Sequence, residues 1–388
     1  MNDNGFHRGQ FTRSASIAFL GLMSRMRAAL LYGALCTVTS ASAQTSAQPT
    51  PLGADIPHIA LLLPVDSSTF GRHAEALRAG FMAASQFPDP TTMLIRVYPV
   101  GEEPKRAVDS YRQAVSTGAR LVVGPLVRAA VNAVAAGDIS VPTLVLNAPE
   151  GGLPNRQNLY SISLLIEAEA RQAARLAFQE GRRSAFTVTG PGMLLGRVYQ
   201  AFVETFVKLG GRHAGDFQYN PSVAELERLR ETLATRPADM AFLALDPRQA
   251  HTIRPALDTL PLYASSQTFS PDPGATLAEV RVLDMPWLLE HDHPAVMIYP
   301  RQNYGDADLE RLYALGIDAW RIGQAMLARH TDINLDGVTG KLTLMRDHQF
   351  HREVVARRLG GEAAALPPGA ISPAPPVIFP PALRSQNP

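Results

Sequence analysis

Two short segments carry residues with the spacing of metal ligands. Residues 332–337, Asp-Ile-Asn-Leu-Asp-Gly, match the opening of an EF-hand calcium loop, in which alternate oxygens face one cation and a glycine turns the chain sharply. The twelfth position of such a loop supplies a bidentate carboxylate, and here it is Thr343. His291-Asp292-His293 offers two imidazoles, but no third ligand at a suitable spacing is evident nearby. We therefore predict a polar turn and an exposed loop, and no metal site.

Nucleophilic and cofactor chemistry have no complete motif in this sequence. Gly190-Pro191-Gly192 begins like a dinucleotide-binding fingerprint, but the third glycine position holds Leu195. Gly340-Lys341 is followed by Leu342, where a phosphate-binding loop has Ser or Thr. No Gly-x-Ser-x-Gly elbow occurs, and the single cysteine lies in the predicted leader. We expect a protein that is not an enzyme and that uses no cofactor.

The charge balance argues against a nucleic-acid partner. The 388 residues include 36 Lys and Arg against 35 Asp and Glu, so the chain has no strong positive field for a phosphate backbone or an anionic membrane surface. A hydrophobic content of 46% with 18% charged residues is typical of a globular protein.

The N-terminal segment is typical of a secretory signal. Two arginines precede an apolar stretch over residues 28–38, and the small residues 41–43 follow it. We predict a signal peptide over residues 1–43, cleavage after Ala43 and a periplasmic product. The alternative is lipidation of Cys36 and anchoring in the outer membrane, which is disfavoured because a leucine stands directly before this cysteine, where that processing prefers a small residue.

Apolar runs alternate with helical stretches, which is the pattern of parallel sheets with crossover helices. The first run is residues 59–63, and the alternation restarts near residue 167 with a second set of similar size. Continuous apolar strands indicate burial on both faces. We predict an α/β fold of two doubly wound parallel-sheet lobes joined by multiple crossovers. The expected divisions are a linker over 44–57, the first part of lobe 1 over 58–163, lobe 2 over 164–289 and a return segment over 290–360 that completes lobe 1 and the hinge. The return begins with residues 296–299 and a long helix over 306–329, and a Pro-rich tail follows over 361–388.

Any small-ligand site is expected between the lobes, because ligands of open α/β sheets bind outside the carboxyl ends of the strands. Asp66 and Asp246 stand at such ends, although a carboxylate there can equally cap the following helix. The predicted cleft residues are Asp66, Ser67, Ser68, Gly124, Pro125, Asn147, Gly190 and Asp246.

Several stretches together resemble the C-terminal domain of the penicillin-binding-protein activator lipoproteins, over roughly residues 57–359. The resemblance implies a type I periplasmic-binding-protein fold, in a short form without the N-terminal helical-repeat domain of the larger members. Trp287 and Tyr313, in the two most specific stretches, can alternatively be core aromatics. The stretches are Ile59–Pro64, Arg78–Phe81, Val122–Leu126, Val141–Asn147, Glu169–Ala174, Gly196–Val198, Asp284–Leu288, Leu312–Ala319 and Gly337–Leu342.

The resemblance implies a non-enzymatic regulator of peptidoglycan synthesis that activates a bifunctional, class A penicillin-binding protein by direct contact. The alternative is a solute-binding protein that closes on an amino acid or similar small molecule and feeds an ABC transporter. The two share a fold, so the fold does not separate them. Residues 147–150, Asn-Ala-Pro-Glu, favour the first, because amino-acid binders usually present small hydroxyl residues at this loop.

Overall fold

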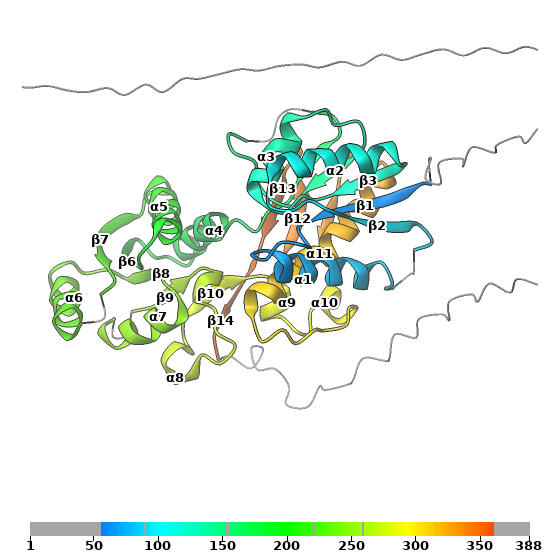
Figure 1. Ribbon diagram of the computed structural model, residues 1–388. Coiled ribbons are helices and arrows are strands. Elements are labelled where there is room, and N and C mark those ends of the chain that lie inside the picture. The colour runs from blue at the N-terminus through cyan, green and yellow to red at the C-terminus, as the bar shows by residue number, and fades with distance from the viewer. Residues whose placement is uncertain (1–55, 89–90, 153–155, 221, 258–259, 361–388) are drawn as a thin grey trace, which may run out of the picture. The chain divides into compact units, whose positions relative to one another are not determined.

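Two parallel sheets with the same strand order form the body of the molecule (Figure 1). The computed structural model describes residues 56–88, 91–152, 156–220, 222–257 and 260–360, which all belong to one compact unit. The predicted signal peptide, most of the linker and the Pro-rich tail lie outside the described residues. Among the helices of the described part, none is long and apolar enough to cross a membrane.

Sheet A forms the centre of the first lobe and has the order β2-β1-β3-β4-β5, with all strands parallel. All six residues of β1 are buried, as a continuous apolar run predicts for a strand covered on both faces. The strands are β1 (His58–Leu63), β2 (Leu94–Pro99), β3 (Ala119–Val123), β4 (Thr143–Val145) and β5 (Leu159–Ser161).

Helices cover both faces of sheet A. The alternate residues Leu61 and Leu62 of β1 belong to different hydrophobic clusters, one with α1 (Gly71–Ala84) and α11 (Ala307–Leu327), the other with α2 (Pro104–Ser116) and α3 (Arg128–Ala136). Helices α1 and α11 pack closely because Gly316 has no side chain: a Cβ there would lie 2.1 Å from the carbonyl oxygen of Leu77.

Sheet B forms the second lobe and repeats this order in its five parallel strands, with an antiparallel sixth strand beside β10, giving β14-β10-β9-β8-β6-β7. Phe202 stacks on Phe242 with ring centroids 4.1 Å apart, in the core between this sheet and helices α4 and α5. The strands are β6 (Ser184–Thr189), β7 (Arg212–Gln218), β8 (Met240–Ala244), β9 (Leu262–Ala264), β10 (Arg281–Asp284) and β14 (Val355–Arg358). The helices are α4 (Ile166–Gln179), α5 (Met193–Lys208), α6 (Val223–Thr235), α7 (Pro247–Ile253), α8 (Gly274–Leu277) and the 3₁₀ turns η1 (Arg254–Ala256) and η2 (Ser266–Thr268).

The predicted α/β fold of two doubly wound sheets is confirmed, but the return segment differs from the expected 290–360. Met285 already packs in the core of the first lobe, whereas β14 lies in sheet B as an antiparallel edge strand. Residues 294–297 form helix α10 (Pro294–Met297), which has Pro294 in its first turn and is capped by His293. The remaining elements are α9 (Pro286–Leu289) and the antiparallel sheet C of β11 (Asn334–Asp336), β12 (Lys341–Leu344) and β13 (Phe350–Glu353).

Candidate functional site

The loop after β1 carries Asp66, Ser67 and Ser68, and two of these side chains are engaged locally. The Ser67 hydroxyl accepts from the amide of Phe70 at 2.9 Å and donates to Glu102 at 2.6 Å, which lowers the pKa of that carboxyl. Asp66 pairs with Arg106 at 2.6 Å. Ser68 is exposed. This loop, which holds three of the predicted cleft residues, is therefore largely a turn held by its own side-chain hydrogen bonds and by the ion pair with Arg106.

The loops after β3 and β4 lie at the same edge of sheet A. Gly124 has φ +105°, and a Cβ on it would lie 2.2 Å from the carbonyl oxygen of Leu62, so this position requires glycine. Pro125 follows, and its carbonyl accepts from the amide of Leu146 at 3.0 Å. Asn147 donates to the carbonyl of Leu126 at 3.1 Å, which joins the two loops.

Gly190 and Asp246 lie at the carboxyl edge of sheet B, after the neighbouring strands β6 and β8. Asp246 forms a capping box with Gln249: its carboxylate accepts from the Gln249 amide at 2.8 Å, and its own amide donates to the Gln249 side chain. A Cβ at Gly190 would meet the same glutamine side chain at 2.6 Å. The capping interpretation of Asp246 is therefore correct.

A pocket of about 230 Å³ is lined by residues of both lobes, and Asn147 is the member of the eight predicted cleft residues that lines it. The other seven, all of them described, are not among its lining residues. Most of its wall is apolar, and its charged residues include the Arg197–Glu167 pair at 2.7 Å. Burial opposes ionisation of Glu167, but Arg197 outweighs it and the pKa of this carboxyl is lowered. The apolar lining residues are Leu126, Leu146, Leu164, Leu165, Ile166, Leu194, Leu312 and Leu315.

A buried ionic network links α4 and β10 of the second lobe to α11, which covers sheet A, and to β13 of sheet C. Arg352 of β13 pairs with Glu169 of α4 at 2.7 Å, and both side chains are 4% exposed. Glu169 also accepts from the amide of Ser266 at 3.1 Å. The carbonyl of the same serine accepts from Arg311 of α11 at 2.8 Å, and this arginine holds the fully buried Asp284 of β10 at 2.7 Å. We call these five residues the hinge network.

The electrostatics of the hinge network follow from its burial. Burial is the largest influence on Glu169 and raises the pKa of its carboxyl, although the charge of Arg352 acts in the opposite direction. Burial alone would lower the pKa of Arg311, but the charge and hydrogen bonds of Asp284 outweigh it and raise this pKa. Asp284 therefore holds Arg311 in its charged form, whereas burial disfavours the charge of Glu169 and Arg352 opposes that effect. Loss of either partner leaves a buried group uncompensated.

The sequence stretches that carry the family resemblance contain several of these buried polar residues. Glu169 and Asp284 belong to the hinge network, and Asp318 accepts from both the amide and the hydroxyl of Thr339, at 2.8 and 2.7 Å. Trp287 and Tyr313 are fully buried, so the interpretation of them as core aromatics is correct. Sequence reasoning did not find the hinge network, although acids within otherwise apolar stretches were its signal.

The two metal-like segments have structural roles. Asn334 and Asp336 lie on β11, which pairs with β12, and Thr343 lies opposite Asn334 in the register. His293 caps α10 by accepting from the amide of Ala295 at 3.2 Å. Burial and the charge of Arg301 lower the pKa of His291. Within the described residues, no group of three or more His, Cys, Asp or Glu side chains is placed to hold a metal ion.

Comparison with protein families gives a match over both sheets. The model of a family described as LppC putative lipoprotein matches residues 53–357. The penicillin-binding protein activator LpoA of Klebsiella pneumoniae subsp. pneumoniae is 29% identical over 286 residues, which are 62% of this chain and 40% of that protein. LpoA of Edwardsiella piscicida is 28% identical over 68% of this chain and 44% of that protein. The chain thus spans less than half the length of these curated relatives.

Solved structures share the fold. The structure of a putative branched-chain amino acid ABC transporter from Chromobacterium violaceum has a TM-score of 0.69 and 36% identity, and covers 78% of this chain and 100% of that chain. The C-domain of LpoA from Haemophilus influenzae, described as a regulator of PBP1A, has a TM-score of 0.65 and 23% identity, and covers 79% and 98%. These similarities confirm the expected periplasmic-binding-like fold.

Proposed function

The chain belongs to the family of LppC putative lipoproteins, and from this membership we propose that it activates a class A penicillin-binding protein by direct contact. The observation that carries the proposal is the extent of the family match, which includes sheets A and C, sheet B except Arg358, and the whole hinge network. The relatives named as penicillin-binding protein activators align with 62% and 68% of this chain, although their own chains are longer.

The hinge network supports a role as a recognition surface. A binding protein that closes on a solute moves its lobes about the segments that join them. Here α4 and β10 of the second lobe are tied to β13 and α11 by Arg352–Glu169 and Arg311–Asp284, which are buried ion pairs with additional hydrogen bonds. We infer that the body presents a fixed face to its partner. Such a protein activates by binding the active state of the partner more tightly than the inactive state.

We also infer that the chain acts in the cell envelope and without catalysis of its own. The family is described as lipoproteins and the relatives are named activators. Export rests on the predicted leader over residues 1–43, and the choice between cleavage after Ala43 and lipidation of Cys36 is decided by the intact mass of the envelope protein. A mass that corresponds to a chain beginning at Cys36 with added acyl groups would exclude cleavage after Ala43.

Solute binding is the second candidate, and two observations favour it. The structure described as a putative branched-chain amino acid ABC transporter is 36% identical, and the leucine-rich pocket beside Asn147 suits an aliphatic side chain. An amino acid also needs partners for both its charged ends. Glu167 already pairs with Arg197, so binding would have to break or share this ion pair.

One pair of titrations separates the two candidates. The purified chain is titrated with the cognate class A synthase, and separately by calorimetry with leucine, isoleucine and valine. The Leu194→Arg variant, which places a charge at the pocket wall, is the control. We expect the chain and this variant to bind the synthase alike, with no heat from the amino acids. If the chain does not bind the synthase, and an amino acid gives a heat of binding that Leu194→Arg abolishes, the function is solute binding.

A further inference from the structure

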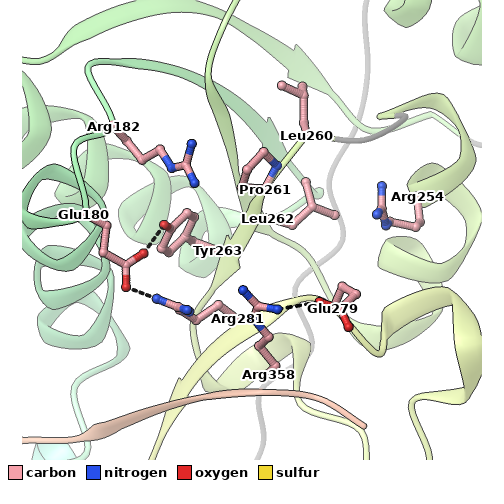
Figure 2. Close-up of a pocket in the computed structure, with 10 residues that line it drawn as sticks. All are labelled: Glu180, Arg182, Arg254, Leu260, Pro261, Leu262, Tyr263, Glu279, Arg281 and Arg358. Carbon is pink, nitrogen blue, oxygen red and sulfur yellow. Dashed lines mark hydrogen bonds and ion pairs between the residues drawn. The ribbon is translucent and has the colours of Figure 1, made fainter. Parts of the chain in front are cut away.

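A second pocket, of about 360 Å³, is larger than the one beside Asn147 (Figure 2). It lies at the edge of sheet B opposite to the edge that carries Gly190 and Asp246. The parallel strands β9 and β10 begin here, at Leu262 and Arg281, and the antiparallel β14 ends here at Arg358. The pocket is therefore separate from the edge where α/β sheets usually bind ligands. Its charged lining residues are Arg182, Arg254, Arg281, Arg358, Glu180 and Glu279.

The sheet register places two of these arginines directly opposite each other. Arg281 of β10 pairs with Tyr263 of β9 on one side and with Arg358 of β14 on the other. Residues opposite each other in a sheet lie on the same face, and like charges in such pairs are destabilising. Burial, and then the charge of Arg358, lower the pKa of Arg281. The fold thus keeps two guanidinium groups close together at the pocket, although their repulsion opposes it.

The two glutamates neutralise only part of this charge. Glu180 accepts from the Tyr263 hydroxyl and pairs with Arg281 (Figure 2). Glu279 pairs with Arg358 at 2.9 Å, but their side chains are 68% and 60% exposed, so this pair exchanges readily with solvent. Among the described residues that line the pocket, four arginines stand against two glutamates.

The remaining side chains of the pocket extend its recognition chemistry. The Nε of Arg182 is buried and makes no hydrogen bond within the described part of the chain. Figure 2 draws Arg182 and Arg254 on opposite sides, with Tyr263 and Leu262 between them. The arginines that line the pocket therefore come from several elements, and residues 260–262 form a partly apolar part of its wall.

We propose that this arginine pocket, defined by Arg182, Arg254, Arg281 and Arg358, binds a small dianion, carried either by paired carboxylates or by a phosphate group. Guanidinium groups bind carboxylate and phosphate oxygens through two parallel hydrogen bonds, and an anion with two negative charges can contact both Arg281 and Arg358, which lie opposite each other. The anion displaces Glu279 from Arg358 and neutralises the repulsion between Arg358 and Arg281. The argument for this site uses no contact with a synthase, so failure of either proposal leaves the other standing.

The test titrates the purified chain at low ionic strength with glutarate and, separately, with inorganic phosphate, followed by calorimetry. Arg358→Gln removes a charged donor and should weaken binding about tenfold. Glu279→Gln removes the competing carboxylate and should tighten binding several-fold. The matched control is Arg175→Gln, because Arg175 is an exposed arginine of α4 that does not line the pocket.

The direction of the Glu279→Gln effect is the sharpest part of the test, because a surface glutamate with no link to a site would change nothing. Binding of either anion with this pattern supports the proposal, and the tighter anion identifies carboxylate or phosphate as its source. The proposal is overturned if neither anion binds, if Glu279→Gln does not tighten binding, or if Arg175→Gln weakens binding as much as Arg358→Gln. Circular dichroism of each variant establishes that it is folded. If Arg358→Gln does not fold, the Glu279→Gln variant alone decides the test.

Discussion

The hinge network and the arginine pocket both combine arginines with carboxylates, but they differ in burial and in balance. In the hinge network, Arg352 and Glu169 are 4% exposed and each has further hydrogen bonds. In the arginine pocket, Arg358 and Glu279 are mostly exposed and positive charge is in excess. The buried charges of the hinge network specify how the lobes are joined. The exposed charges of the arginine pocket can exchange their partners for solvent or a ligand.

The largest effect is expected from breaking the hinge network. Arg352→Met leaves Glu169 buried without its cation and should lower the free energy of unfolding by about 3–5 kcal/mol, measured by urea denaturation. The double variant Arg352→Met with Glu169→Leu removes both charges and should recover much of this loss. A single variant as stable as the parent chain would show that the pair does not hold the connection.

Asp318 provides a second, smaller test of the buried charges. Asp318→Asn replaces one of the two carboxylate oxygens with an amide nitrogen, which then faces either the amide of Val338 or that of Thr339, and should lower the free energy of unfolding by about 1–3 kcal/mol. Asp308→Asn is the control, because Asp308 lies on the same helix and pairs with Arg311, but its side chain is 67% exposed. Equal losses in the two variants would contradict the distinction between buried and exposed carboxylates.

The pocket pair Arg197–Glu167 should make a pH-dependent contribution to stability. The pKa of Glu167 is lowered from 4.5 in the folded chain, so its contribution is present above that pH and is lost as the pH falls through the folded pKa. Arg197 is 53% exposed, which limits the contribution to about 1 kcal/mol or less. The difference in unfolding free energy between the parent chain and Arg197→Gln should therefore shrink on acidification. A difference that grows at low pH would reverse the sign of the argument.

The smallest effect is expected at the arginine pocket. Arg358→Gln removes one member of the like-charged pair with Arg281 and should change the free energy of unfolding by no more than about 0.5 kcal/mol, towards greater stability. The measurement is the same urea denaturation as for Arg352→Met, in buffer without added dianions. A loss of stability near that of Arg352→Met would remove the contrast between the two clusters.

The alternation of apolar runs predicts the two doubly wound sheets because each strand and its crossover helix are local in sequence. Asp246 illustrates a partial success, since its strand-end position follows from the sequence, but its capping bonds decide that it is not a free carboxylate. Arg281 and Arg358 could not be paired in advance, because β14 is a four-residue edge strand far along the chain from β10. Glu169 and Arg352 come together in the same non-local way.

The measurement that tests the central claim most directly is glycan cross-linking by the cognate class A synthase as the purified chain is added. We expect a rise that saturates with chain concentration, of at most roughly 5–150-fold, because allosteric coupling is typically about 1–3 kcal/mol. The Arg358→Gln variant should produce the same rise, since the arginine pocket is independent of activation. Cross-linking that stays constant at chain concentrations well above that of the synthase would contradict the proposed activation.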